Sequence, residues 1–544
     1  MKLYKNKVLC VIMTILVGIT SLCGCGTSSE AGKNQDGMFT PYPYSYEQEI
    51  NTIDDNYRNY YEIFVYSFYD SDGDGIGDLQ GVIDKLDYIQ EMGFQGIWLM
   101  PVMPSTTYHK YDVIDYMDID SEYGTLADFQ DLVTECHKRD IRLVIDFVIN
   151  HTSSQNAWFT QACDYLRTLE DGEEPDTSVC PYVDYYHFST EKVNGTYYGV
   201  PGVNWWYEGS FWDQMPDLNL QNENLRSDIE EIAKFWIDMG VDGFRMDAAM
   251  HYEENDTEGN TEALQWLYEY CKSLNPDFYM VSEVWANEKT IADYYDSQTP
   301  SMFNFDAASA EGKIMKAART GSAVGFVDAM LRYQEDFSAE NPDYIDAPFL
   351  TNHDQVRTAN ALNSNLDNMK MAAGLLLSMN GSPFVYYGEE IGMKSSGTKD
   401  ENKRLPMYWS TEDETGMTKG PSGCDRNLEQ AFAPLDEQLK DPDSLVNYYH
   451  RALMIRNENP EIARGTIEKV EELCDGTQAA ITKTYEGSTI GILYNTAEQE
   501  ITLQLQGTAL EGMEIRGYLT LHGEVVTLDN QELTMPAKSI CIVK

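Results

Sequence analysis

Basic residues are scarce in this chain. Its 544 residues include 38 Lys and Arg against 90 Asp and Glu, which gives a formal net charge of −52. Nucleic acid is therefore excluded as a partner, because its phosphates would be repelled. A solvated acidic coat that keeps a secreted protein soluble accounts for most of the charge. Acidic loops that hold calcium account for a smaller share.

The N-terminal apolar run is too short to cross a membrane. It covers residues 8–22, about 15 residues, and follows three lysines, which is typical of a secretory signal. Its end, Leu-Cys-Gly-Cys, resembles the bacterial lipobox. That resemblance implies a leader over 1–24, cleavage before Cys25, and a diacylglyceryl thioether on Cys25. A polar tether over 25–45 would follow. An uncleaved anchor and an ordinary signal peptide are the alternatives.

A regular cysteine framework is also missing. Of ten cysteines, two leave with the leader and Cys25 would be acylated, so seven remain. An odd number without regular spacing does not make a disulfide framework, and no CxxC pair indicates zinc. Cys163 and Cys180 lie in the same loop-rich segment and could pair.

Apolar runs that alternate with helical segments are the main structural signal. Helices are expected, for example, over 126–140 and 224–240. Such alternation predicts βα units around a parallel sheet, and eight units close a (β/α)₈ TIM barrel. The eight strand-like runs are 62–70, 94–102, 142–150, 241–247, 278–285, 302–306, 347–354 and 383–390.

Two segments break this rhythm. Residues 151–215 are rich in Gly, Pro, Asn and aromatics and are predicted to form an inserted subdomain, domain B, after the third strand. Residues 461–544 contain short β-rich runs separated by turn residues, which predict a C-terminal all-β sandwich. The catalytic barrel then comprises 46–150 and 216–460.

Three carboxylic acids close three of the apolar runs. Asp247 ends the fourth run, Glu283 lies near the end of the fifth, and Asp354 ends the seventh. Acids at the carboxyl ends of barrel strands meet where such enzymes do their chemistry. A nucleophile, an acid and a third acidic partner are what retaining glycoside hydrolysis requires. The alternative is that each acid caps a helix or pairs with a base.

The neighbours of these acids suggest their roles. Arg245 lies two residues before Asp247, so both side chains point to the same side of the strand. The guanidinium is expected to lower the pKa of Asp247, as suits a charged nucleophile. Apolar neighbours and nearby anions are expected to raise the pKa of Glu283, as suits a proton donor.

Several segments, in order, resemble the sequence regions of the α-amylase family, glycoside hydrolase family 13. DFVINH (146–151), GFRMDAAMH (243–251), SEVW (282–285) and FLTNHD (349–354) resemble its four main regions. MPDLNL (215–220) resembles the region typical of the intermediary group between oligo-1,6-glucosidases and neopullulanases. Met250 departs from the lysine that amylases often carry there, which leaves product length open.

The resemblance implies a role for each matching residue. Asp247 would be the nucleophile, Glu283 the general acid and base, and Asp354 the transition-state stabiliser. Asp146 would be a structural acid. The residues implied to contact the sugar are His109, Tyr111, Asp112, His151, Arg245 and His353.

Calcium is the expected cofactor. Asp70, Asp72, Asp74 and Asp78 offer oxygen ligands at alternate positions of a Gly-rich loop, which suits Ca²⁺. The loop is not an EF-hand, because Gly81 stands where a glutamate is needed. Resemblance to the oligo-1,6-glucosidase-like branch adds the Ile76 carbonyl. The family also implies a possible second site, with Asn150, Asp217 and the His251 carbonyl as ligands.

The sequence therefore predicts a retaining endo-acting α-amylase. It would cleave α-1,4 bonds of starch and maltooligosaccharides at the extracellular face of the membrane, held only by its lipid anchor. An exo-acting α-glucosidase or a neopullulanase- or cyclomaltodextrinase-like enzyme is the main alternative, because Asp112 and Arg404 could clamp a chain end. A non-catalytic transporter partner or glycan-binding protein is disfavoured by the three acids.

Overall fold

The computed structural model describes residues 38–39, 53–253 and 255–544. The predicted leader, Cys25 and most of the predicted tether lie outside these residues. In the part that is described, no helix has both the length and the apolar character needed to cross a bilayer.

A parallel sheet forms the centre of the fold. Seven strands run in the order β10-β1-β2-β3-β7-β8-β9. Parallel bridges join Phe303 to Ala347 and Phe349 to Phe384, so residues 347–349 lie between β9 and β10 and close the ring. These eight places form the predicted (β/α)₈ barrel. The strand bounds are β1 (Tyr60–Ile63), β2 (Gly96–Leu99), β3 (Arg142–Phe147), β7 (Gly243–Met246), β8 (Tyr279–Ser282), β9 (Ser301–Met302) and β10 (Phe384–Tyr386).

Aromatic side chains fill part of the barrel interior. The Tyr60 ring stacks on Tyr279 and on Phe384, with centroid distances of 5.2 and 4.7 Å. Both faces of a barrel strand are covered, so its sequence is apolar almost throughout. That continuity is the property by which the sequence predicted the strands.

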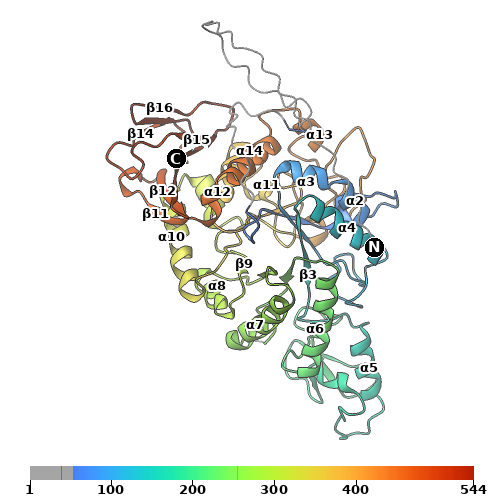
Figure 1. Ribbon diagram of the computed structural model, residues 1–544. Helices are drawn as coiled ribbons and strands as arrows, with labels where there is room; N and C mark the ends of the chain where they lie inside the picture. Colours follow the sequence, from blue (N-terminus) through green and yellow to red (C-terminus); the bar gives the residue numbers. More distant parts are fainter. Residues whose placement is uncertain (1–37, 40–52, 254) are drawn as a thin grey trace, which may run out of the picture. The chain divides into compact units, whose positions relative to one another are not determined.

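Helices surround the sheet (Figure 1). In α4, buried Phe129, Leu132, Val133 and Cys136 follow helical spacing, and Thr125 and Asp128 form a capping box that starts the helix. Along the outer ring α6 packs on α7, α7 on α8, and α8 on α10. The helix bounds are α1 (Val65–Phe68), α2 (Leu79–Asp84), α3 (Leu86–Met92), α4 (Leu126–Lys138), α6 (Glu223–Asp238), α7 (Thr257–Leu274), α8 (Glu288–Tyr294), α9 (Lys313–Thr320), α10 (Ala323–Glu340), α11 (Thr358–Ala361), α12 (Leu366–Ser378), α13 (Leu435–Gln438), α14 (Leu445–Glu458) and α15 (Glu461–Arg464).

The first predicted strand, 62–70, is partly wrong. Residues 60–63 pair with β2 and β10, but the chain then leaves the sheet and Val65–Phe68 form the short helix α1. The Ser67 hydroxyl donates to the Arg404 carbonyl at 2.7 Å, which fixes this turn against a distant loop. A tertiary contact therefore overrides the β-forming residues of the run.

The insertion after β3 contains α5 (Ala157–Leu166), a 3₁₀ turn (Pro181–Asp184) and the small antiparallel sheet β4-β6-β5. Its strands are β4 (Phe188–Ser189), β6 (Trp206–Glu208) and β5 (Tyr197–Gly199). A bridge between His151 and Asp217 joins the two ends of the insertion, so it begins and ends at one place beside β3. Cys163 and Cys180 are not paired, and all seven cysteines of the described residues are free thiols.

The C-terminal region contains two antiparallel sheets, in the orders β11-β12-β13-β18-β15 and β14-β17-β16. The hairpin of β16 and β17 was missed in the sequence. Asn530 and Gln531 link it with φ angles of 51° and 66°, a two-residue turn usually marked by Asn-Gly. The strands are β11 (Thr466–Lys469), β12 (Gln478–Tyr485), β13 (Ser488–Asn495), β14 (Ile501–Gln504), β15 (Ile515–Leu519), β16 (Thr527–Asp529), β17 (Glu532–Met535) and β18 (Ser539–Val543).

Candidate active site

The three acids singled out in the sequence line one cavity. Asp247 follows β7, Glu283 follows β8, and Asp354 follows the barrel segment 347–349. The cavity has a volume of about 520 Å³ and lies at the carboxyl ends of the strands. Its lining residues are His109, Tyr111, His151, Phe211, Trp212, Met215, Asp247, Ala248, Met250, His251, Glu283, Trp285, Asp354, Asp400 and Arg404.

The Arg245 guanidinium contacts three acids of the site. Its Nη1 lies 2.6 Å from Asp247 Oδ1 and 2.8 Å from Asp146 Oδ1. Its Nη2 lies 3.1 Å from Glu283 Oε2. The guanidinium is buried and packs over the Trp98 ring at 5.1 Å. One planar cation thus fixes three carboxyl groups relative to one another.

A second set of charges holds Asp354. Its Oδ2 lies 3.1 Å from His353 Nε2, and its Oδ1 lies 2.7 Å from Arg404 Nη2. His353 Nδ1 lies 2.6 Å from Glu62 Oε1. Burial disfavours the charge on His353, but Asp354 and Glu62 outweigh it and raise its pKa to about 9. Burial also opposes the charge on Asp354, yet His353 and Arg404 hold its pKa well below the usual range.

The other two acids respond differently. Burial raises the pKa of Asp247 even though Arg245 acts in the opposite direction, and the charge of Asp354 raises it further. The predicted lowering of the Asp247 pKa is therefore wrong, because desolvation outweighs one ion pair. Burial also raises the pKa of Glu283, to which the charges of Asp247 and Asp354 add.

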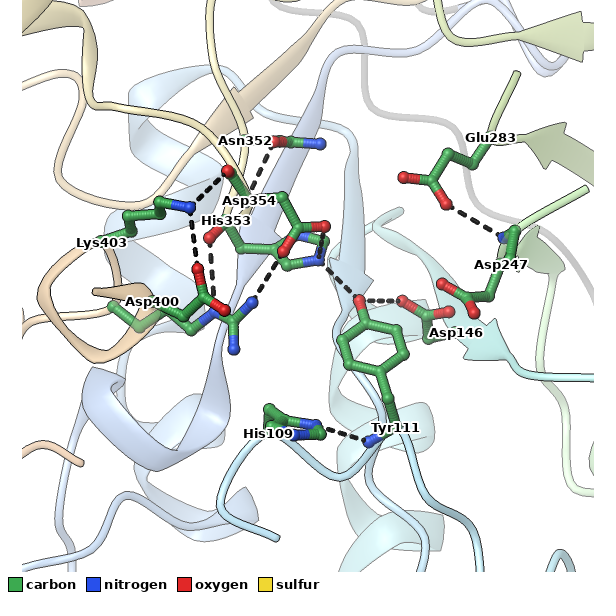
Figure 2. Close-up of polar contacts among 12 residues, drawn as sticks. His109, Tyr111, Asp146, Asp247, Glu283, Asn352, His353, Asp354, Asp400 and Lys403 are labelled. Carbon is green, nitrogen blue, oxygen red and sulfur yellow. Dashed lines mark hydrogen bonds and ion pairs between the residues drawn. The ribbon is translucent and has the colours of Figure 1, made fainter. Parts of the chain in front are cut away.

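Tyr111 connects the two halves of the site (Figure 2). Its hydroxyl donates to Asp146 Oδ2 at 3.0 Å and lies 2.7 Å from His353 Nε2. The Tyr111 amide donates to Nδ1 of His109 at 3.2 Å. These bonds set the orientation of the Tyr111 ring, which lines the cavity.

His151 lines the cavity. Its Nε2 is buried and has no hydrogen-bond partner among the described residues. Burial lowers the pKa of His151 to about 4, so the ring is neutral at pH 7. A neutral imidazole in the cavity wall adds no charge beside a bound ligand.

Some predicted contact residues do not reach the cavity. Asp112 is buried, and its carboxylate accepts hydrogen bonds from the Ser105, Thr106 and Thr107 hydroxyls. It is not among the lining residues, and neither are the buried Arg245 and His353.

The sequence did not reveal every residue of the site. Glu62, the partner of His353, was missed, although an acid inside an apolar strand was a usable signal. Three exposed aromatic side chains on the cavity wall were missed too: Phe211, Trp212 and Trp285 are 50%, 44% and 51% exposed. Their exposure depends on the insertion and loops, which have no periodic pattern.

The loop after α1 gathers part of the predicted calcium set. Ligand oxygens of Asp70, Asp72 and Asp78 lie within 4.8 Å of one another. Asp74 is outside this group; its Oδ1 accepts the Ile76 amide at 2.7 Å and its carbonyl accepts Lys419 Nζ at 2.7 Å. Three carboxylates fit a hard cation, but Ca²⁺ takes six to eight oxygens in proteins. They therefore supply only part of a coordination shell.

The possible second metal set is partly assembled as well. Asn150 Nδ2 donates to Asp217 Oδ1 at 3.4 Å, and the Ser210 amide donates to Asp217 Oδ2 at 2.9 Å. Asn150 Oδ1 is buried without a hydrogen-bond partner among the described residues. The unpaired amide oxygen of Asn150, next to the Asp217 carboxylate, is a type of ligand that suits a hard cation. His251 lies against Phe211, with ring centroids 5.1 Å apart.

The barrel is closed and carries acids at the carboxyl ends of its strands. Two of these acids contact the same guanidinium. This is the arrangement of a glycoside hydrolase that works through paired carboxyl groups. The chain belongs to the α-amylase family, because residues 62–465 match the family model "Alpha amylase, catalytic domain". It is a glycoside hydrolase of α-glucans.

Known proteins show the same relationship. The chain is 40% identical to Alpha-amylase 3 of Dictyoglomus thermophilum, over 76% of this chain and 80% of that protein. It is 28% identical to an oligo-1,6-glucosidase of Parageobacillus thermoglucosidasius, over 76% of this chain and 85% of that protein. The solved structure of Eubacterium rectale Amy13B superposes with a TM-score of 0.89 and 44% identity, covering 92% of this chain and 97% of that one.

The charge on His353 makes stability depend on pH. Its folded pKa of about 9 lies above the usual 6.5, so its contribution is complete below pH 6.5 and is lost as pH rises through 9. The stability gap between wild type and His353→Gln should shrink by roughly 3 kcal/mol over that interval, at 1.36 kcal/mol per pKa unit. Urea unfolding at several pH values measures the gap. The exposed His522→Gln serves as control, and a constant gap for His353→Gln would contradict the assignment.

Proposed function

We propose that this chain is a retaining, endo-acting α-amylase that cleaves α-1,4-glucosidic bonds of starch and maltooligosaccharides. The observation that carries the proposal is the shared guanidinium of Arg245, which contacts Asp247 and Glu283 at 2.6 and 3.1 Å. Both carboxyl groups thus contact one cation and line one cavity, as the nucleophile and the proton donor of a double displacement must. Retention of configuration is what the resemblance to the α-amylase family implies.

Each acid has a role in this mechanism. Asp247 attacks the anomeric carbon while Glu283 donates its proton to the leaving glycosidic oxygen. Glu283 then takes a proton from a water molecule, whose oxygen attacks the anomeric carbon and displaces the Asp247 carboxylate. His353 and Arg404 keep Asp354 ionised. Its carboxylate accepts hydrogen bonds from hydroxyl groups of the distorted sugar ring and stabilises the positive charge that develops on that ring.

The surroundings of the cavity support endo action. A clamp for a chain end would need Asp112, but its carboxylate is already bound by three hydroxyl groups. Arg404 is bound to Asp354. The exposed rings of Phe211, Trp212 and Trp285 offer faces on which further glucose units can stack. Exo action is the alternative because a relative at 28% identity is named an oligo-1,6-glucosidase.

Two further expectations belong to this proposal. The carboxylates of Asp70, Asp72 and Asp78 would bind Ca²⁺ and stabilise the loop between α1 and α2. The lipobox-like end of the leader supports attachment through Cys25 to the outer face of the cell membrane.

The catalytic roles predict distinct kinetic signatures. Asp247→Asn and Glu283→Gln should each lower kcat by about a thousandfold or more, since a nucleophile or proton donor is lost. Glu283→Gln should also remove the alkaline limb of the pH profile, because that limb reports loss of the Glu283 proton. Steady-state hydrolysis of maltoheptaose from pH 4 to 10 measures both. The exposed Asp238→Asn on α6 is the control, and an alkaline limb kept in Glu283→Gln would exclude it as the acid.

Substrate ends separate endo from exo action. A maltoheptaoside blocked at its non-reducing end should be cut at a rate within a few-fold of that of the unblocked substrate. Chromatography of the products measures this. Release of glucose from the unblocked substrate, with no cleavage of the blocked one, would favour the exo-acting alternative.

Calcium should stabilise the fold through the loop of 70–78. Adding Ca²⁺ to chelator-treated protein should raise Tm by several degrees, because the ion binds only the folded loop. Asp72→Asn should remove most of this rise, whereas Asp171→Asn in the insertion should leave it unchanged. Differential scanning calorimetry provides the measurement. An equal rise in Asp72→Asn and wild type would show that the ion binds elsewhere.

A further inference from the structure

Asp354 is held differently from the other two acids. Asp247 and Glu283 directly follow β7 and β8, so the register of the sheet sets their places. Asp354 lies in a loop several residues beyond the barrel segment 347–349. Its amide donates to Asn352 Oδ1 at 3.1 Å within that loop. A contact from outside the loop is therefore needed to tie the backbone of Asp354 to the barrel.

The Lys403 side chain makes such a contact (Figure 2). Its Nζ donates to the Asp354 carbonyl at 2.8 Å and lies 2.8 Å from Asp400 Oδ1. Only 14% of the Lys403 side chain is exposed, so oxygen atoms of the protein take the place of water around the ammonium. Because the Asp400 carboxylate attracts the ammonium, the donor to the Asp354 carbonyl stays in one place.

The backbone of Lys403 is itself fixed to the barrel. Its amide donates to the Asp400 carbonyl at 2.9 Å, where the 3₁₀ turn Asp400–Asn402 ends. Its carbonyl accepts Nε of the buried Arg357 at 3.1 Å and the Tyr386 hydroxyl of β10 at 3.3 Å. Lys403 thus connects the backbone of Asp354 to a strand of the barrel.

Lys403 and Arg404 hold different parts of Asp354. Arg404 Nη2 lies 2.7 Å from the Asp354 carboxylate, and its Nε donates to the His353 carbonyl at 3.3 Å. Lys403 holds the Asp354 carbonyl instead. A carboxylate held at its oxygens and at its backbone cannot turn away from the sugar without breaking one of these contacts. Such a fixed direction matters for a group that stabilises a developing charge, because small displacements slow the reaction.

We propose that Lys403 is a positioning residue of the reaction, whose ammonium fixes the backbone of Asp354 and so directs the Asp354 carboxylate at the sugar ring. This inference goes beyond the proposed function and rests on the role that the proposed function gives to Asp354. Lys403 is not among the residues that line the cavity, so it acts through Asp354 without touching the substrate.

Substitution of Lys403 tests the proposal by steady-state kinetics on maltoheptaose. Lys403→Met removes the ammonium and keeps most of the apolar stem. Its kcat should fall by about tenfold or more while KM stays within about twofold, because a misplaced carboxylate weakens binding of the transition state more than binding of the substrate. Lys403→Arg keeps a charged donor and should restore kcat to within about threefold of the wild-type value.

Lys394→Met is the matched control for Lys403→Met. Lys394 Nζ also donates to a backbone carbonyl, that of Glu429 at 3.0 Å, and Lys394 does not line the cavity. The control should keep the wild-type kcat. Equal kcat values in Lys403→Met and Lys394→Met would overturn the proposal.

Inhibitor binding separates positioning from a general structural role. Acarbose carries a half-chair ring and a basic nitrogen, which imitate the distorted and charged sugar of the transition state. Its affinity for Lys403→Met should fall by about the same factor as kcat/KM, while the calorimetric affinity for maltose stays within about twofold. An equal loss of both affinities would indicate a distorted cavity and would overturn the proposal.

A double-mutant cycle tests whether Lys403 acts through Asp354. In the Asp354→Asn protein no carboxylate charge remains to be directed, so adding Lys403→Met should change kcat by less than about twofold. A loss as large as in the wild-type background would overturn this inference and leave the proposed function intact. A wild-type kcat in Asp354→Asn itself would refute the proposed role of Asp354, and this inference with it.

Discussion

The ion pairs of Arg245 are the interaction on which the site depends. The side chain is buried in β7 and contacts acids that come from β3, from the end of its own strand and from the end of β8. Because the three strands are neighbours in one sheet, their register sets where these acids lie. The spacing of the reacting carboxyl groups is therefore a property of the barrel, and loops have little influence on it.

The cluster around Arg245 contains three acids and one cation, and this excess of acids favours a retained proton. Desolvation raises the pKa of Asp146 to about 7 and also raises the pKa values of Asp247 and Glu283. A cluster of buried acids relieves its repulsion by retaining a proton. A retained proton is what a donor to a glycosidic oxygen needs. The burial of these acids therefore both destabilises their charged forms and keeps a proton available for catalysis.

The sequence predicted the parts of the molecule that repeat or that depend on strand ends. Strands such as 96–99 and 142–147 have apolar side chains on both faces, and Asp247 and Glu283 follow strands directly, so their place was predictable. Residues placed by tertiary contacts were not. The helix α1 replaces a predicted strand, Asp112 turns toward hydroxyl groups, and desolvation reverses the expected shift at Asp247. None of these effects has a local sequence signal.

The unpaired cysteines have a consequence for how the folded state can be observed. Burial raises the pKa values of the thiols of Cys136, Cys271 and Cys541, which belong to α4, α7 and β18. A thiol reacts with alkylating reagents only as its thiolate, which is scarce and inaccessible at these positions. Alkylation of these three thiols in the absence of denaturant would then proceed only through molecules that open spontaneously. The alkylation rate of each thiol would then measure how often its surroundings open in the native state. The three thiols report separately on α4, α7 and β18.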